Sequence, residues 1–218
     1  MLLYANGDSH VLGAMKDKLQ GKSFVDLLVD EFQVLVHNDA EVASSVTRIV
    51  RTTKEYISNN PTSDTFILIG FGTWEREEWE YNGEFYNIMQ GWYKHLPPVL
   101  LERYYNWMNT QDSDLLTIKS KQCHKDIIGL HQYLNKKNIP HLFFNCMYNF
   151  VHTVDGTTGD EPFDWDNRYI GPYDKNKSYY WYLKNNGFES DHWYHFDEYA
   201  HALWAKRLIN HIKENKLI

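Results

Sequence analysis

Short apolar runs alternate with longer amphipathic segments along the chain of 218 residues. A short apolar run bounded by turn residues is typical of a buried strand, whereas apolar residues that recur every three or four positions indicate a helix. The predicted strands are Leu2–Asn6, Phe32–His37, Thr65–Gly72 and the run at 141–150. The predicted helices are Val11–Leu19, Phe24–Glu31, Ser44–Ser58, 99–109, Asp112–Asn135, Ser178–Asn185 and Asp197–Asn215.

The alternation of strands and helices predicts a parallel sheet with helices on both faces, a three-layer α/β/α fold. Right-handed connections and the near-continuous apolar run at Leu2–Asn6 place the first strand inside the sheet. We therefore expect the flavodoxin-like order second, first, third, fourth, with room for a short fifth strand before the C-terminal helix. The length predicts one domain over 1–218.

Two aromatic-rich segments interrupt this pattern, at about 73–96 and 151–190. Periodicity fades in both, so we expect them to be largely irregular. Because a long connection without secondary structure in a compact domain is usually functional, the first is predicted to be an active-site loop or lid.

Composition narrows the range of partners. Hydrophobic residues make up 43% of the chain and aromatic residues 16%, including 8 Trp and 16 Tyr. Aromatic side chains at this density fill a core or line a concave apolar or sugar-binding surface. The net charge is −7, from 22 basic and 29 acidic residues, and no basic run is present. Nucleic acid is therefore excluded as an expected partner.

The cysteines and the apolar runs bear on location. Cys123 and Cys146 do not have the spacing of a metal site. The segment that begins at Met1 shows neither the charged region nor the cleavage site of a signal peptide, and no apolar run reaches transmembrane length. We expect a reduced, cytoplasmic protein without a membrane span; the sequence does not indicate its oligomeric state.

The first candidate for chemistry is Ser9, which follows the first predicted strand in the sequence Gly7-Asp8-Ser9-His10. Gly7 permits a sharp turn, and ligands of open α/β sheets gather at the carboxyl ends of the strands. Ser9 would lie there at the start of a helix, where free N–H groups favour developing negative charge. A serine between a strand and a helix is also a common N-cap, and taken alone this position favours the cap over the nucleophile.

The second candidate is a cluster just before the C-terminal helix. His195 is placed to act as a general base, and Asp191, four residues earlier, to orient its imidazole. His192, His195 and His201 are alternatively metal ligands, although no zinc-type spacing supports this. A third interpretation is structural, with Asp197 capping the helix and the histidines packed as polar aromatic residues.

Taken together, Gly7-Asp8-Ser9 and the block from Asp191 to His195, followed by Ala200-His201, resemble the first and last sequence blocks of the SGNH, or GDSL-type, hydrolases. The resemblance implies an α/β/α domain that hydrolyses esters such as acyl lipids, acetylated sugars and thioesters. It implies Ser9 as the nucleophile and His195 and Asp191 as its partners, with no cofactor and no metal.

The chain departs from the family pattern in the block that follows the second strand. The family has a glycine there whose N–H contributes to the oxyanion hole, and in this chain Ala43 or Ser44 stands at that position. A backbone donor survives a change of side chain, so this departure does not remove the donor. In the last block the acid and the histidine are four residues apart rather than three, which leaves Glu189 open as the acid in place of Asp191.

The third block departs further. The family has Gly-x-Asn-Asp, with the asparagine amide as an oxyanion donor, whereas this chain has Gly70-Phe71-Gly72-Thr73. The resemblance places Gly70 and Gly72 in the oxyanion and binding region. Thr73 is the nearest side chain able to replace the amide, and Trp74 and Arg76 are more distant candidates. We expect Trp74 to form a pocket wall and Arg76 to form a salt bridge with Glu75.

The sequence thus predicts a serine esterase that acts on a small-molecule ester, with the aromatic segments at 74–93 and 163–182 forming an acyl or sugar pocket. Because the third-block asparagine is missing, two other classes stay open. One is a weakly active or inactive module on the same fold that binds carbohydrate or peptide. The other is an assembly protein that buries the aromatic segments at an interface.

Overall fold

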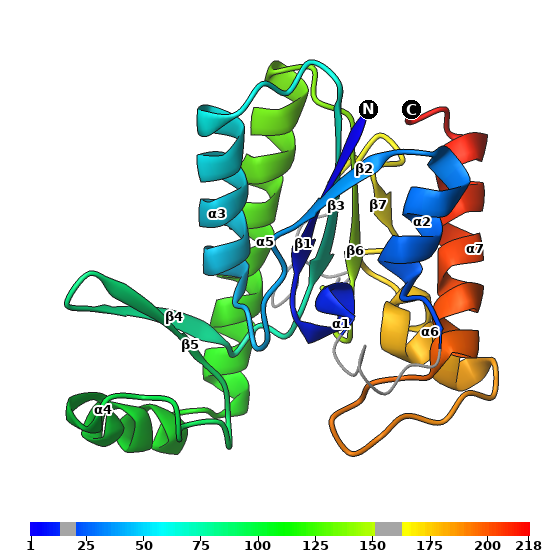
Figure 1. Ribbon diagram of the computed structural model, residues 1–218. Coiled ribbons are helices and arrows are strands. Elements are labelled where there is room, and N and C mark those ends of the chain that lie inside the picture. Colours follow the sequence, from blue (N-terminus) through cyan, green and yellow to red (C-terminus); the bar gives the residue numbers. More distant parts are fainter. Residues whose placement is uncertain (14–20, 151–162) are drawn as a thin grey trace.

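The computed structural model describes residues 1–13, 21–150 and 163–218, which form a parallel sheet between two layers of helices (Figure 1). The strand order is β2-β1-β3-β6-β7, and neighbouring strands are parallel. This is the predicted order, with β7 as the short fifth strand. The strands are β2 (Leu35–Asn38), β1 (Leu2–Gly7), β3 (Thr65–Phe71), β6 (His141–Asn145) and β7 (Tyr169–Ile170).

Helices α3 and α5 cover one face of the sheet, and α2, α6 and α7 cover the other (Figure 1). The predicted three-layer α/β/α class is therefore confirmed. None of the helices described has the length and apolarity needed to cross a membrane. The helices are α1 (Ser9–Leu12), α2 (Phe24–Phe32), α3 (Val46–Asn59), α4 (Pro98–Asn109), α5 (Ser113–Lys136), α6 (Tyr179–Asn185) and α7 (Glu198–Glu214), with a short 3₁₀ turn, η1 (Lys175–Lys177).

The central strands are buried on both faces, which explains why they are continuously apolar. In β1, Leu3 and Ala5 belong to the core under α2 and α7, whereas Tyr4 between them belongs to the core under α3 and α5. The same alternation separates Phe144 from Phe143 in β6. Because side chains alternate along a strand, each of these strands contributes apolar side chains to both cores. Burial of this kind stabilises the fold by roughly 25 cal/mol per Å² of apolar surface.

Three predicted boundaries are wrong. Phe32 ends α2 instead of starting a strand, because Gln33 takes a left-handed conformation with φ 52° and closes the helix. The fourth strand ends at Asn145, well before residue 150. The first helix ends at Leu12, where Gly13 is left-handed with φ 72°; the rest of the predicted helix, at 14–20, lies outside the described residues.

The segment at 73–96 is not irregular as predicted. It contains an antiparallel hairpin of β4 (Glu77–Tyr81) and β5 (Glu84–Ile88), joined by Asn82 and Gly83, both with positive φ. An Asn-Gly pair between strands is a strong hairpin signal, and it was present in the sequence. The hairpin and α4 extend sideways from the main body and share a small aromatic core (Figure 1).

Two glycines allow β1 and β3 to approach closely where the site forms. Gly7 and Gly70 are paired in register across these strands. A Cβ on Gly7 would lie 2.4 Å from the Val11 side chain and 2.6 Å from the Gly70 carbonyl oxygen, and one on Gly70 would lie 2.5 Å from Val11. Glycine is therefore required at both positions for α1 to fold back over the ends of the strands. The side chains of Val11 and Phe144 pack directly against Gly70, so no larger residue fits at this position.

Candidate active site

Ser9 begins α1 directly after β1. The residue before it, Asp8, has an extended backbone and accepts the His10 N–H through its carboxylate at 3.0 Å. Asp8, and not Ser9, is therefore the N-cap, so the capping interpretation of Ser9 is wrong. Ser9 lies in the first turn, where backbone N–H groups have no acceptor within the helix. Its hydroxyl is available for other contacts.

His195 reaches Ser9 from the other end of the chain. Its Nε2 lies 3.0 Å from Ser9 Oγ, which is within the range expected between a nucleophile and a general base. Its Nδ1 lies 3.6 Å from Asp191 Oδ2. The structure thus brings together the three residues that the sequence predicted as a group, with the acid slightly beyond hydrogen-bonding distance of the ring.

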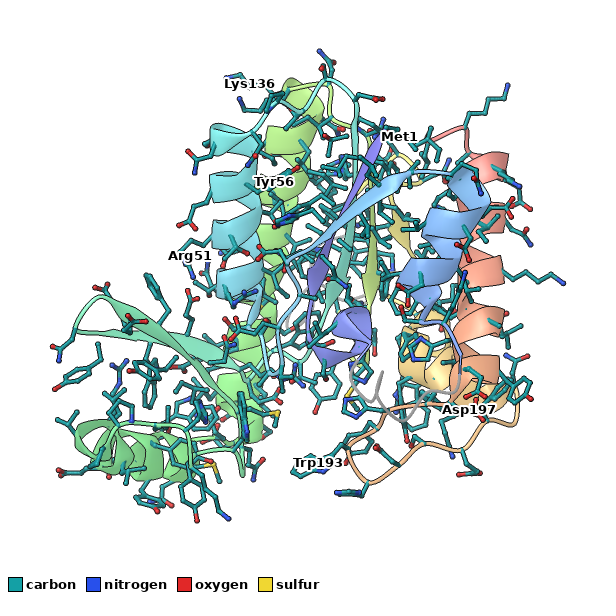
Figure 2. The ribbon with its side chains drawn as sticks, in the orientation of Figure 1. Met1, Arg51, Tyr56, Lys136, Trp193 and Asp197 are labelled. Carbon is teal, nitrogen blue, oxygen red and sulfur yellow. The ribbon has the colours of Figure 1, made fainter. Side chains whose placement is uncertain are left out.

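Asp191 also shapes the loop that carries His195. Its Oδ1 accepts the backbone N–H groups of Trp193 at 2.8 Å and His195 at 2.9 Å, and its own N–H donates to the His195 carbonyl at 2.9 Å. Tyr194 completes this turn with a φ of 69°. Figure 2 shows Trp193 in this loop and Asp197 where α7 begins. Asp197 caps α7 as the sequence suggested, through the Ala200 N–H at 3.0 Å.

The alternative acid and the alternative metal ligands lie elsewhere. Glu189 is 88% exposed at its side chain and pairs with Lys184 at 2.6 Å, so Asp191 is the acid beside the imidazole. His192 is exposed, whereas His201 is buried and accepts the Phe24 N–H at 3.2 Å through Nδ1. Within the described ranges, His192, His195 and His201 do not form a metal-type cluster.

The electrostatics around His195 favour a neutral ring. Burial, together with the nearby His10 ring at a centroid distance of 5.5 Å, lowers the pKa of His195 below its ordinary value of 6.5, while the Asp191 charge opposes this shift. Burial acts to raise the pKa of Asp191, but the N–H groups of His195 and Trp193 outweigh it and lower that pKa. A neutral imidazole next to an ionised carboxylate is the state that a general base requires.

Behind Ser9, Asp8 is completely buried and holds two partners. Its Oδ2 accepts Arg76 Nη1 at 2.8 Å, and its Oδ1 contacts His10 Nδ1 at 2.9 Å. Burial acts to raise the pKa of Asp8, but His10 and Arg76 outweigh it and hold that pKa far below its usual range, so the carboxylate stays charged. The predicted salt bridge between Arg76 and Glu75 is therefore wrong, because Arg76 pairs with Asp8.

Asp8, His10 and Cys146 carry donor atoms that lie within 4.8 Å of one another, which is the spacing of a metal site. Their chemistry does not fit a cation. Asp8 already neutralises the Arg76 guanidinium. Burial and the Asp8 charge raise the pKa of the Cys146 thiol, which keeps it protonated. The three residues form a hydrogen-bonded support beneath α1.

The loop after β2 brings Val42 and Ala43 to the same pocket as Ser9. Ala43 is buried and has a φ of 61°, a conformation that glycine adopts most easily, in keeping with the glycine of the family block. Ser44 uses its N–H for the Glu41 carbonyl at 3.2 Å. Of the two predicted positions, Ala43 lines the pocket with Ser9, whereas Ser44 does not.

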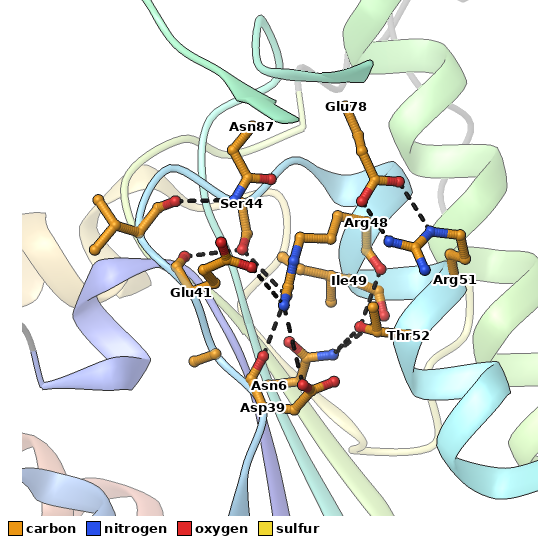
Figure 3. Close-up of polar contacts among 12 residues, drawn as sticks. Asn6, Asp39, Glu41, Ser44, Arg48, Ile49, Arg51, Thr52, Glu78 and Asn87 are labelled. Atoms are coloured by element: carbon orange, nitrogen blue, oxygen red, sulfur yellow. Dashed lines mark hydrogen bonds and ion pairs between the residues drawn. The ribbon is translucent and has the colours of Figure 1, made fainter. Parts of the chain in front are cut away.

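Arg48 fixes this loop from the side of α3 (Figure 3). Its Nη1 donates to the Asp39 carbonyl at 3.1 Å and to Ser44 Oγ at 3.3 Å, and its Nη2 pairs with Glu41 at 2.7 Å. From the hairpin, the Asn87 amide donates to the carbonyl of Val42 at 3.1 Å. The loop is thus held from both sides, so the Ala43 backbone has a fixed position.

The third block differs from the prediction. Thr73 is buried, and its hydroxyl donates to Glu75 Oε1 at 2.5 Å, so its proton is directed to that carboxylate. The second oxygen of Glu75 is buried and has no partner among the described residues. Trp74 stacks on Phe150 at a centroid distance of 4.7 Å and belongs to a core. It also lines a pocket, as predicted, but one next to Tyr148 and α5 that does not include Ser9.

Ser9 and His195 line a pocket of about 560 Å³ at the carboxyl ends of the strands. Its walls come from α1, the Ala43 loop, the third block, the hairpin segment and the His195 loop. Two tryptophans, two tyrosines and two methionines contribute its apolar surface, and polar groups surround Ser9. The lining residues are Ser9, His10, Val42, Ala43, Thr73, Glu75, Arg76, Met89, Gln90, Trp92, Met147, Tyr148, His192, Trp193, Tyr194 and His195.

Comparison with solved structures identifies the fold. The chain aligns over 96% of its length with 97% of a member of the lipolytic protein G-D-S-L family from Veillonella parvula, with a TM-score of 0.52 and 12% identity. It aligns over 98% of its length with 97% of a psychrotrophic esterase, EstA, from Pseudoalteromonas sp., with a TM-score of 0.51 and 12% identity. The fold is that of the GDSL-type hydrolases.

At 12% identity the likeness shows the GDSL-type fold and no more. No protein-family model matches the chain, and no curated protein matches it by sequence. The chain is therefore a divergent example of the GDSL-type fold, and its chemistry must be argued from its own residues.

Proposed function

We propose that this protein is a serine hydrolase that cleaves a carboxylic ester, with Ser9 as nucleophile, His195 as general base and Asp191 as the acid that orients the imidazole. The observation that carries the proposal is the 3.0 Å contact between Ser9 Oγ and His195 Nε2, both of which line a pocket of about 560 Å³. The lipolytic and esterase proteins that share the fold support it.

The reaction follows from these positions. Ser9 Oγ attacks the ester carbonyl carbon while His195 Nε2 accepts the hydroxyl proton, which gives a tetrahedral oxyanion. The oxyanion accepts hydrogen bonds from the Ser9 and Ala43 N–H groups. His195 then gives its proton to the departing alcohol, and an acyl group remains on Ser9. Water attacks this acyl-enzyme with His195 again as base, which releases the carboxylic acid and restores Ser9.

The substrate we propose is an acyl or acetyl ester on a sugar or a lipid. The aromatic walls offer flat apolar surface, which suits an acyl chain or the face of a sugar ring. A second candidate function, a binding module without catalysis, is favoured by one observation. The Glu75 carboxylate lines the same pocket with an unpartnered oxygen, and a negative charge there suits a substrate hydroxyl better than an oxyanion.

Labelling with a fluorophosphonate probe tests the proposal, because only an activated serine reacts with it. We expect the wild type to be labelled and to hydrolyse short p-nitrophenyl esters, and Ser9→Ala to lose both properties. Ser58→Ala is the matched control, since Ser58 is exposed and only donates to the Lys54 carbonyl. A wild type that is neither labelled nor active on any ester or thioester tested would favour the binding module.

The pH dependence gives an independent prediction. Since the pKa of His195 lies below 6.5 and only the neutral ring accepts a proton, kcat/KM should stay high below pH 6.5 and fall only as pH drops through the lowered pKa. In Asp191→Asn the charge that opposes the shift is removed, so the acid limb should move to still lower pH. A pH profile measured on a p-nitrophenyl ester checks both points, and a wild-type midpoint above 6.5 would contradict them.

A further inference from the structure

Position 72 is where the third-block asparagine of the GDSL-type hydrolases would stand. Here it is Gly72, and the space beside it is occupied. A Cβ built on Gly72 would lie 2.7 Å from Arg76 Nη1 and 2.8 Å from Asp8 Oδ2. The guanidinium of Arg76 therefore fills the volume in which a side chain at position 72 would begin.

Arg76 is fixed in this place. Its side chain is only 7% exposed, and Nη1 donates to Asp8 Oδ2 at 2.8 Å. Asp8 in turn is completely buried and is anchored by His10. Asp8 directly precedes Ser9, so the cation is tied to the same turn that presents the nucleophile. A guanidinium held by a buried carboxylate has little freedom, which is the property that a preorganised donor needs.

Arg76 also has donor capacity to spare. Its guanidinium carries five N–H groups, and it is part of the pocket wall with Ser9. Nε is buried, and no acceptor for it is found in the part of the chain that the structure describes. A buried cation with unpaired donors is costly, so the guanidinium gains from an acceptor that reaches its remaining N–H groups from the pocket that Arg76 lines. Thr73, by contrast, already donates its hydroxyl hydrogen bond to Glu75.

We propose that Arg76 is the third oxyanion donor of this site and replaces the asparagine amide of the family. The inference rests on the proposed ester hydrolysis. Arg76 stays protonated throughout and moves no proton; its N–H groups donate to the carbonyl oxygen as negative charge develops on it. A charge-assisted hydrogen bond is roughly twice as strong as a neutral one.

The first test compares Arg76→Ala with Arg51→Ala, a matched control whose guanidinium pairs with Glu78 and Glu55 away from the pocket. We expect Arg76→Ala to lower kcat by roughly 10²–10³-fold, the usual effect of one oxyanion donor, with KM changed much less. Affinity for a trifluoromethyl ketone, which forms a tetrahedral adduct with the serine, should fall in parallel. A merely structural residue would not give this split between kcat and KM.

The second test exchanges the donors. Gly72→Asn alone should lose activity, because its Cβ would meet the Arg76 guanidinium. In the double variant Gly72→Asn/Arg76→Ala the guanidinium no longer occupies this position. Asp8 Oδ2, which lies 2.8 Å from the same Cβ, also loses the cation that holds it there, so the carboxylate can move aside and the asparagine amide can take the family position. We expect this double variant to be at least about tenfold faster than Arg76→Ala alone, a gain equal to part of one donor's effect.

The outcomes separate this inference from the proposed function. If the wild type is labelled by the fluorophosphonate but folded Arg76→Ala keeps wild-type kcat and inhibitor affinity, the Arg76 inference is overturned and the esterase stands. If the wild type is neither labelled nor active, the proposed function fails first. Should Arg76→Ala not fold, Asp8→Asn/Arg76→Met removes both buried charges together, and the same loss of kcat is expected. Wild-type kcat in that variant would also overturn the inference.

Discussion

Replacing His195 with alanine is expected to lower kcat for a short ester by roughly four to six orders of magnitude, because the serine then lacks the base that accepts its proton. The reason is geometric. Nε2 of His195 lies 3.0 Å from Ser9 Oγ, and none of the other bases described is recorded in contact with that hydroxyl. Labelling of Ser9 by a fluorophosphonate should be lost together with the hydrolysis.

The same pair allows a double-mutant test. Because Ser9 and His195 act as one unit, Ser9→Ala/His195→Ala should be no slower than either single variant. His211→Ala is the matched control, since His211 is half-buried on α7, contacts the Asn167 carbonyl and does not line the pocket of Ser9. If the effects of the two substitutions multiplied in the double variant, or if His195→Ala kept most of the wild-type rate, His195 would not be the base for Ser9.

The central strands can be predicted from the sequence because a strand that is buried on both faces consists mainly of consecutive apolar residues. Strand β1 from residue 3 to residue 7 and all of β3 are buried, and largely apolar runs mark both strands in the sequence. Strand β2 is at the edge of the sheet and is exposed along its length, so its start was placed three residues too early. In β4, three of the five residues are glutamate, and Trp79 is the buried one, so tertiary packing determines this strand.

The candidate site also contains residues that the sequence predicts and residues that it does not. Ser9 and His195 are 186 residues apart, yet each lies next to a recognisable block, and the topology brings the blocks together. Asp8 and Arg76 are 68 residues apart and carry no such signal. Their contact depends on how the chain bends after β3 toward the hairpin, which the sequence alone does not show. The sequence offers one indication of this contact: Gly72 stands where the family has an asparagine, and the missing side chain leaves space that Arg76 occupies.

Asp8→Asn is expected to reduce the free energy of unfolding by about 3–5 kcal/mol, the usual cost of removing one partner of a buried ion pair. Asparagine caps a helix about as well as aspartate, so the start of α1 should be kept. What is lost is the charge, since Arg76, with a side chain only 7% exposed, keeps its cation without a counterion. Chemical denaturation monitored by circular dichroism near neutral pH measures the difference.

Asp197→Asn provides the matched control. Asp197 caps α7 through the Ala200 N–H at 3.0 Å but is exposed, so the same change there should alter stability by less than about 0.5 kcal/mol. Asp8→Asn/Arg76→Met should recover most of the loss, because neither charge is then left buried alone. Equal stability of Asp8→Asn and Asp197→Asn would show that the Asp8–Arg76 pair contributes nothing. A loss that the double variant recovers would mean that the acid before the nucleophile is there to hold Arg76 in position.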